Sequence, residues 1–245
     1  MTTELVIVLA VSAFFIGVSK AGFSGVSLIS VFLLAENFGA KESLGVALPM
    51  LIMADLLVYP AYRKYGSWGP VWKFLWPALI GIGIALWGLH AFSNETVRVV
   101  IGSIILSMVG MQLLRKWAPV FFEKMVHSHS FGIAAGVSGG VATMMANAAG
   151  PIMQLYLLSR RMPKMELIGV GARFFLVVNF LKLPLSAGLD LITWETLKWD
   201  FIMLPSVVLG VLIGKKLLVK VPQKAFEATV VVFALIAGLR LVSGS

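Results

Sequence analysis

The sequence lacks cysteine altogether and contains few of the residues from which catalytic or metal sites are usually built. Without cysteine there is no disulfide, no thiolate nucleophile and no cysteine-ligated metal. The three histidines, His90, His127 and His129, lie at segment ends or in a loop and do not form an HExxH spacing. No phosphate-binding loop motif is present, which argues against direct ATP drive. We therefore predict no enzyme, no metal site and no cofactor.

Charge is also scarce. Only 13% of the 245 residues are charged and 59% are hydrophobic, whereas soluble domains carry about 25% charged residues. Apolar runs of membrane-spanning length recur along the chain, which indicates a multi-pass protein in a lipid bilayer. The net charge of +9 suggests nucleic acid in a soluble protein. Here the basic residues lie mainly in short connections between apolar runs, so membrane topology explains them better and no nucleic-acid partner is predicted.

The N-terminus has no basic segment before its first apolar run, which disfavours a cleaved signal peptide.

Two long apolar runs, residues 5–35 and 131–158, are interrupted in the middle by small and polar residues, at 19–25 and 147–151. Backbone that leaves a helix inside a bilayer must be buried in protein or line a wet cavity, because lipid offers no hydrogen bonds. Paired interruptions in two halves of a chain point to the binding site of a transporter. In the first run, each part is too short to cross a core of roughly 30 Å. A re-entrant hairpin fits, and one broken spanning helix is the alternative.

The remaining apolar runs predict six ordinary spans, at 43–62, 74–92, 97–114, 167–187, 197–214 and 225–242. An internal repeat relates the first three of these spans to the last three. Residues 42–46 match 166–170, and in the same register Asp55 faces Asn179 and Pro60 faces Pro184. We therefore divide the chain into a first membrane repeat, 1–125, and a second, 126–245.

The distribution of charge predicts the topology of these repeats. The basic connections, 63–73, 115–124, 160–164 and 215–224, should face the cytoplasm. Two of them flank the second interrupted run, which should therefore enter and leave on one side. The expected fold is an all-α polytopic membrane protein with two inverted repeats, each a re-entrant or broken helical hairpin plus three transmembrane helices. Eight full crossings with parallel halves are the alternative, which puts one basic connection on the wrong side.

The two interruptions supply most of the candidate substrate-binding residues. Half-helices that begin after each break would present free N–H groups to an anion, with Ser24 and Asn147 as N-cap residues and Pro151 in a first turn. Small residues beside them would let the backbone approach a ligand. The alternative is that these small residues only permit tight helix packing. The candidates of this small type are Gly22, Gly25, Ala148 and Gly150.

Ionisable residues inside membrane spans are costly and are functional candidates by default. Lys20 at the first break could attract an anion or extend to the membrane surface. Arg173 could bind an anion through its planar fork, or pack at the cytosolic end. Lys182 and Asp55 could form a buried pair or a coupling site for protons, and Asn179 could hydrogen bond between helices.

Three motifs make the chain resemble the sulfite exporter TauE/SafE family over essentially its full length. They are the small-residue breaks at 17–25 and 136–140, the Gly-Val motifs at 42–47 and 166–171, and the final Gly-Leu-Arg-Leu at 238–241. The resemblance implies secondary transport of small sulfur-containing anions, such as sulfite and the sulfonate sulfoacetate, across the bacterial inner membrane. An anion channel and a non-catalytic membrane assembly subunit are the alternative functions. A coupling proton or ion and a homo-oligomeric state are left open.

Overall fold

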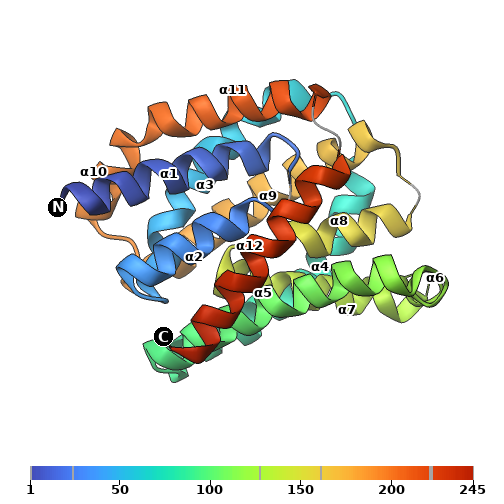
Figure 1. Cartoon of the computed structure of the whole chain (residues 1–245), viewed down its shortest axis with the longest axis horizontal. Coiled ribbons are helices and arrows are strands. Elements are labelled where there is room, and N and C mark those ends of the chain that lie inside the picture. Colours follow the sequence, from blue (N-terminus) through green and yellow to red (C-terminus); the bar gives the residue numbers. More distant parts are fainter. Residues whose placement is uncertain (1, 24, 127, 161, 221–222, 245) are drawn as a thin grey trace.

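A computed structural model describes residues 2–23, 25–126, 128–160, 162–220 and 223–244. Over these residues the chain forms twelve helices and no strand, which confirms the predicted all-α class (Figure 1). The helices are α1 (Thr3–Lys20), α2 (Ser27–Phe38), α3 (Glu42–Tyr62), α4 (Trp68–Ala91), α5 (Asn94–Trp117), α6 (Pro119–Val126), α7 (His129–Ala146), α8 (Gly150–Ser159), α9 (Lys164–Ala187), α10 (Trp194–Ile202), α11 (Leu204–Lys220) and α12 (Gln223–Ser243).

Several helices have the length and composition of membrane spans. Among the described residues five qualify, namely α1, α3, α4, α5 and α9, and α10 with α11 makes a sixth if the bent pair is one span. The polytopic prediction is therefore confirmed. The span predicted at 197–214 is not one straight helix, because the chain bends by 47° between α10 and α11. Pro205 lies in the first turn of α11 and has no N–H to donate to the preceding turn, which favours a break there.

Both predicted interruptions separate helices. In the first, 18 residues of α1 precede 12 of α2, and in the second, 18 residues of α7 precede 10 of α8. In each pair the first helix is longer than the second, and α1 by itself is long enough to count as a candidate membrane span. In Figure 1, α1 begins at the left of the view and α7 begins beside α6 at the right. The inverted arrangement of the halves stays a prediction.

Each helical pair packs against the other half of the chain. The first limb α1 lies along α11, and α7 lies along α4. Glycines allow these backbones to touch: a Cβ on Gly17 would lie 2.3 Å from the carbonyl oxygen of Val207, and one on Gly140 would lie 2.0 Å from that of Ala78. Close approach through small residues is the usual way in which membrane helices associate. The two halves are therefore interlocked, and neither encloses a core by itself.

The repeated Gly-Val motif has equivalent surroundings in both halves. A Cβ on Gly45 of α3 would lie 1.8 Å from the carbonyl oxygen of Leu191, in the connection between α9 and α10. A Cβ on Gly169 of α9 would lie 2.0 Å from the carbonyl oxygen of Tyr65, in the connection between α3 and α4. Each glycine thus lets one central helix meet the connection that follows the other, which locks α3 and α9 together.

The helices α3 and α9 pack against each other at the centre of the molecule (Figure 1). Most of α3 is buried, and its buried face is almost entirely apolar except for Ser43 and Asp55. The buried polar residues of α9 are Arg173, Asn179, Lys182 and Ser186. The polar groups in the interior are therefore concentrated on these two helices.

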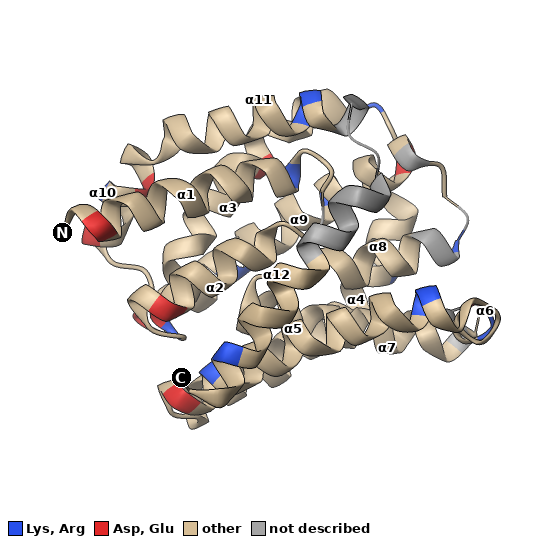
Figure 2. Cartoon of the chain, in the orientation of Figure 1, with Lys and Arg blue, Asp and Glu red and all other residues tan. Residues whose placement is uncertain are grey.

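Charged residues separate toward opposite ends of the molecule. Figure 2 shows Lys and Arg mainly toward the end that carries α6, and several Glu near the N- and C-terminal ends at the left. Two arginines at the acidic end, Arg98 and Arg240, lie 3.8 Å and 3.4 Å from carboxylate oxygens of Glu36. This separation agrees with the predicted topology, in which the basic end faces the cytoplasm.

We expect Gly45→Ala and Gly169→Ala each to lower the melting temperature of the detergent-solubilised protein. Overpacking costs about 1–3 kcal/mol, and in these positions the methyl group would meet backbone rather than a movable side chain. Gly83→Ala on α4 is the control, because a Cβ there has nothing within 4 Å and alanine favours a helix by about 1 kcal/mol. Equal melting temperatures for all three variants would contradict the role of the repeated motif.

Candidate functional site

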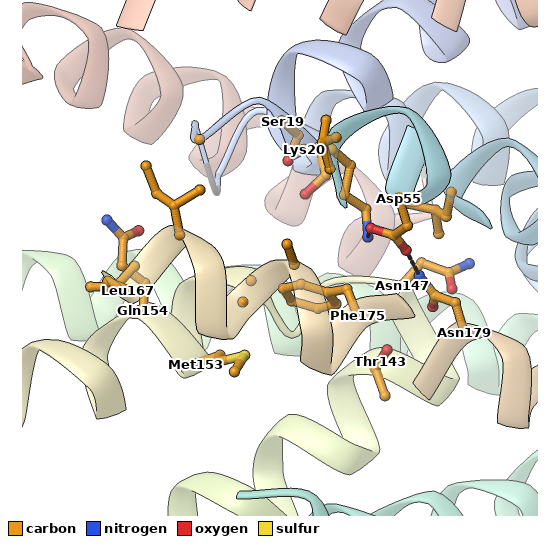
Figure 3. A pocket seen from close by; sticks show the side chains of 18 of the residues that line it. Ser19, Lys20, Asp55, Thr143, Asn147, Met153, Gln154, Leu167, Phe175 and Asn179 are labelled. Carbon is orange, nitrogen blue, oxygen red and sulfur yellow. Dashed lines mark hydrogen bonds and ion pairs between the residues drawn. The ribbon is translucent and has the colours of Figure 1, made fainter. Parts of the chain in front are cut away.

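A cavity of about 90 Å³ lies where the two chain breaks approach the central helices (Figure 3). This volume is far above the roughly 10–15 Å³ that one water molecule requires, so a small oxyanion can be considered. Both halves of the chain contribute to its wall. The polar lining residues are Ser19, Lys20, Ser27, Asp55, Thr143, Asn147, Gln154 and Asn179. The others are Gly22, Leu51, Val58, Gly150, Met153, Leu157, Leu167, Ile168, Gly171, Ala172 and Phe175.

An ion pair joins the first break to the central helices. The Nζ atom of Lys20, at the end of α1, lies 2.8 Å from Oδ1 of Asp55 on α3, and their side chains are 9% and 1% exposed. Asn179 on α9 donates from Nδ2 to the other carboxylate oxygen of Asp55 at 2.7 Å (Figure 3). The carboxylate is therefore held by one group from each of two helices. The predicted role of Asn179 as an interhelical hydrogen-bonding residue agrees with this geometry.

The ammonium group of Lys20 has an aromatic neighbour as well as a carboxylate. It lies 4.3 Å from the centre of the Phe175 ring, which also lines the cavity. A cation over a ring face is stabilised by about 0.5–2 kcal/mol, more when it is desolvated. Lys20 thus bends inward to the cavity rather than outward, and extension to the membrane surface is not its conformation here.

The second break begins with Asn147, which ends α7 instead of starting α8. Its backbone is left-handed, with φ 50° and ψ 29°, a conformation that asparagine tolerates better than most residues. The prediction of an N-cap role is therefore wrong, because two residues, Ala148 and Ala149, separate it from α8. The side chain of Asn147 is used at the cavity: Nδ2 donates to the carbonyl oxygen of Leu44 at 3.2 Å.

Lys182 is buried behind Asn147. Its Nζ donates to the carbonyl oxygen of Thr143 at 2.7 Å and to Oδ1 of Asn147. The predicted pair of Lys182 with Asp55 is not formed, because Lys20 occupies that carboxylate. Lys182 lies one turn beyond Asn179 on α9, so the same helix holds an amide on Asp55 and a cation on the second break.

The other residues predicted at the breaks have different positions. Gly22, with φ 132°, and Gly150, the first residue of α8, line the cavity. Ala148 is fully buried but does not line it, and neither does Gly25. Ser24 lies outside the described residues.

The starts of two helices contribute to the wall of the cavity, but their caps differ from those predicted. The N-cap of α2 is Val26, without a side-chain hydrogen bond, and the first residue of α2, Ser27, lines the cavity. With Gly150 at the start of α8, two helix N-termini border the same space. At the start of α2 the N–H groups of Val26, Leu28 and Ile29 already donate to preceding carbonyls. What such a terminus offers an anion here is therefore mainly the partial positive charge of the helix dipole.

Arg173 lies away from the cavity. Its guanidinium donates to the carbonyl oxygens of Arg63, Tyr65 and Gly169, and it lies 5.8 Å from the ring of Trp68. These carbonyls belong to the connection after α3 and to the preceding turn of α9, so Arg173 fastens the end of one central helix to the other. The structure does not bring it to the predicted substrate site, because its fork is already occupied by backbone oxygens.

Sequence reasoning missed most of the lining residues, among them Phe175 and Thr143, and one buried acid. Phe175 precedes Asn179 by four residues, and this spacing puts both on one face of α9. Thr143 precedes Asn147 by the same interval on α7. Asp200 on α10 is fully buried, and neither carboxylate oxygen has a hydrogen-bond partner among the described residues. Asp200 falls inside the span predicted at 197–214, so the rule that marks ionisable residues within spans as candidates would also have found it.

The model of one protein family, described as Sulfite exporter TauE/SafE, matches residues 9–241 of the chain. The chain belongs to this family. The predicted resemblance is thereby confirmed over nearly the whole length, and the protein is a multi-pass membrane protein of a transporter family. The comparisons with curated proteins and with solved structures give no match.

Arg173→Ala should lower the melting temperature by several degrees, because three backbone carbonyls lose a buried cationic donor. Arg63→Ala is the matched control, since Arg63 contributes only its carbonyl oxygen to this contact and its side chain is exposed. The measurement is thermal unfolding in detergent, with and without added sulfonate. A variant of normal stability that no longer responds to the anion would instead put Arg173 in the substrate site.

Asp200→Asn should leave the melting temperature unchanged or raise it, because burial of a carboxyl group without partners costs free energy. Asp55→Ala should lower it, because Lys20 would then be a buried cation without its partner. Thermal unfolding of both variants in one detergent checks the contrast. A strongly destabilised Asp200→Asn variant would mean that the carboxyl group makes a contact essential to the fold.

Proposed function

We propose that the protein is a secondary carrier that moves small sulfur-containing anions, including sulfite and sulfonates such as sulfoacetate, across the bacterial inner membrane by alternating access. The observation that carries this proposal is the cavity bordered by both chain breaks and by a buried lysine. Family membership supports transport of sulfur anions as the general activity. The polar residues that line the cavity support the choice of binding residues proposed below.

The proposed anion lies between Lys20 and Asn147. The ammonium of Lys20 supplies charge, the carboxamide of Asn147 supplies a directional hydrogen bond, and the helix starts at Ser27 and Gly150 supply partial positive charge. Asp55 holds Lys20 in place while the site is empty. Because the anion and this carboxylate compete for one ammonium, substrate binding weakens the link between α1 and α3.

The packing of the helical pairs suggests how access alternates. The pair α1–α2 is attached to the second half through α11, and the pair α7–α8 to the first half through α4. Movement of one such unit against the other would open one side of the cavity and close the other, as in carriers built from inverted repeats. Both units contribute lining residues, so the substrate would remain bound during the movement.

The first test is uptake of labelled sulfite and of labelled sulfoacetate by proteoliposomes that contain the purified protein. We expect saturable uptake that unlabelled substrate competes away, and protein-free liposomes give the background. Uptake with and without a pH gradient tests whether a proton is coupled. Non-saturating flux would favour a channel, and no flux from folded protein would contradict the proposal.

The contribution of the second break can be tested with Asn147→Gly. Glycine keeps the left-handed backbone without steric cost and removes the carboxamide, so we expect uptake to fall at least about tenfold while the helix end is preserved. Asn37→Ala is the control, because this exposed asparagine donates only to a carbonyl of its own helix. Equal uptake by the Asn147→Gly variant and the wild type would remove Asn147 from the site.

A further inference from the structure

We infer that the end of α5 and the short helix α6, together residues 115–126, form a membrane-surface anchor that binds anionic phospholipid, such as phosphatidylglycerol. This anchor lies in the linker between the two predicted repeats. The inference requires only that the protein is a multi-pass membrane protein and does not depend on the substrate that it carries. Three features support it: the direction of α6, its exposed apolar side chains and the basic residues beside them.

The helix α6 lies across the direction of the membrane-spanning helices. Figure 1 shows α6 from its end at the right of the view, whereas the candidate spans α1 and α5 run across the view. Because Arg115 and Lys116 occupy the last turn of α5 and charged groups avoid the hydrocarbon core, that turn lies in the polar region of the bilayer. The helix α6 begins two residues after α5 ends, so it lies along the membrane surface.

The side chains of α6 divide into a face against the protein and a face that the protein leaves uncovered. Phe122 is 6% exposed and packs in one cluster with Leu155 of α8. Val120 and Phe121 are 82% and 61% exposed, and Trp117, just before the helix, is 76% exposed. Large apolar groups are unfavourable in water, whereas the boundary between lipid headgroups and acyl chains accommodates them. The uncovered face is therefore suited to the bilayer surface.

Basic residues flank these exposed apolar side chains (Figure 2). Arg115 and Lys116 end α5, and Lys124 follows Phe121 by three residues, so these two side chains are neighbours on the surface of α6. All three basic side chains are exposed, and no carboxylate among the described residues forms an ion pair with them. With one acid, Glu123, the anchor keeps a net charge of +2.

This combination of apolar and basic groups fits an anionic phospholipid. Long basic side chains keep their stems on apolar surface and their charge among the headgroups, while Val120 and Phe121 reach the acyl chains. Tryptophan, here Trp117, is typical of the membrane–water interface. Each Lys or Arg near an anionic lipid surface improves binding about fivefold, whereas a zwitterionic lipid such as phosphatidylcholine offers no net charge. The anchor therefore distinguishes the two lipids by charge.

The anchor is attached to a helix that forms part of the cavity wall. Phe122 packs with Leu155 of α8, and the same helix lines the cavity through Met153, Gln154 and Leu157. Lipid bound at α6 thus restrains the helix that follows the second break. Because this packing belongs to the folded state, the bound lipid stabilises that state, as any ligand of the native protein does.

Brominated lipids test the inference, because bromine quenches the fluorescence of a tryptophan that it touches. The purified protein is reconstituted in equimolar phosphatidylglycerol and phosphatidylcholine, with bromine on the acyl chains of one lipid or the other. The emission of Trp117 is the difference between the wild type and Trp117→Phe. We expect brominated phosphatidylglycerol to quench it at least about fivefold more than brominated phosphatidylcholine, and less so at high salt.

Two outcomes of this experiment would overturn the inference. Equal quenching of Trp117 by the two lipids would mean that the anchor does not select charge. No quenching by either lipid would mean that a second copy or another protein covers this surface, or that it lies in water.

Charge variants identify the residues that select the lipid. The neutralised variant, Arg115→Gln with Lys116→Gln and Lys124→Gln, should lose the preference for phosphatidylglycerol. The charge-retaining variant, Arg115→Lys with Lys116→Arg and Lys124→Arg, should keep it. All three positions are exposed, so we expect both variants to fold. A neutralised variant with the full preference would contradict the role of these residues.

The matched control is Arg63→Gln with Lys64→Gln and Lys73→Gln. It also removes one arginine and two lysines at exposed positions, in another connection that is predicted to face the cytoplasm, and it should leave the quenching of Trp117 unchanged. Loss of the preference in this control as well would mean that overall charge, and not the anchor, attracts the lipid.

Thermal unfolding in detergent gives a second readout. Added phosphatidylglycerol should raise the melting temperature of the wild type more than phosphatidylcholine does, and the neutralised variant should lose this difference. Equal melting temperatures of the wild type with the two lipids would contradict the anchor. Absence of sulfite or sulfoacetate uptake would defeat the proposed function and leave this inference standing.

Discussion

The contact on which the interior depends is the ion pair between Lys20 and Asp55. An ion in a medium of low polarity is costly unless it is paired and hydrogen bonded, and here the carboxylate receives a lysine on one oxygen and Asn179 on the other. These three residues come from α1, α3 and α9. The arrangement of the helical pairs around the central helices must therefore be accurate at this point, or a charge is left exposed to hydrocarbon.

Tight backbone contacts make that accuracy attainable. Glycines let α1 lie against α11, α7 against α4, and each central helix against the connection that follows the other. The same interlocking brings the ends of α1 and α7 to one cavity, where backbone groups released from helices can reach protein partners or water. The membrane protein therefore tolerates the two interruptions only because helices from both halves surround them.

The sequence predicted the helical class, the two breaks and the internal repeat because each depends on local pattern: apolar run length, small residues, and spacing between Asp55 and Asn179. It named Lys182 as the partner of Asp55, whereas the structure pairs Asp55 with Lys20. Lys20 and Lys182 are both lysines within apolar segments, so the sequence does not distinguish them as partners of Asp55. Which of them reaches the carboxylate depends on how α1 and α9 are rotated about their axes. The expectation for Arg173 failed for a related reason: its fork could bind an anion or carbonyls, and only packing places three carbonyls beside it.

The two halves supply similar positions but unequal charge. In the first half, the break contributes a cation, Lys20, and the central helix an anion, Asp55; in the second, the break contributes a neutral amide, Asn147, and the central helix a cation, Lys182. In the register of the repeat, Asn179 stands where the first half has Asp55, so Asp55 is the single acid among the described residues that line the cavity. Its two oxygens are bonded to Lys20 and to that same Asn179. The departure from internal symmetry therefore joins the halves at one carboxylate, which two carboxylates placed opposite each other could not do without repulsion.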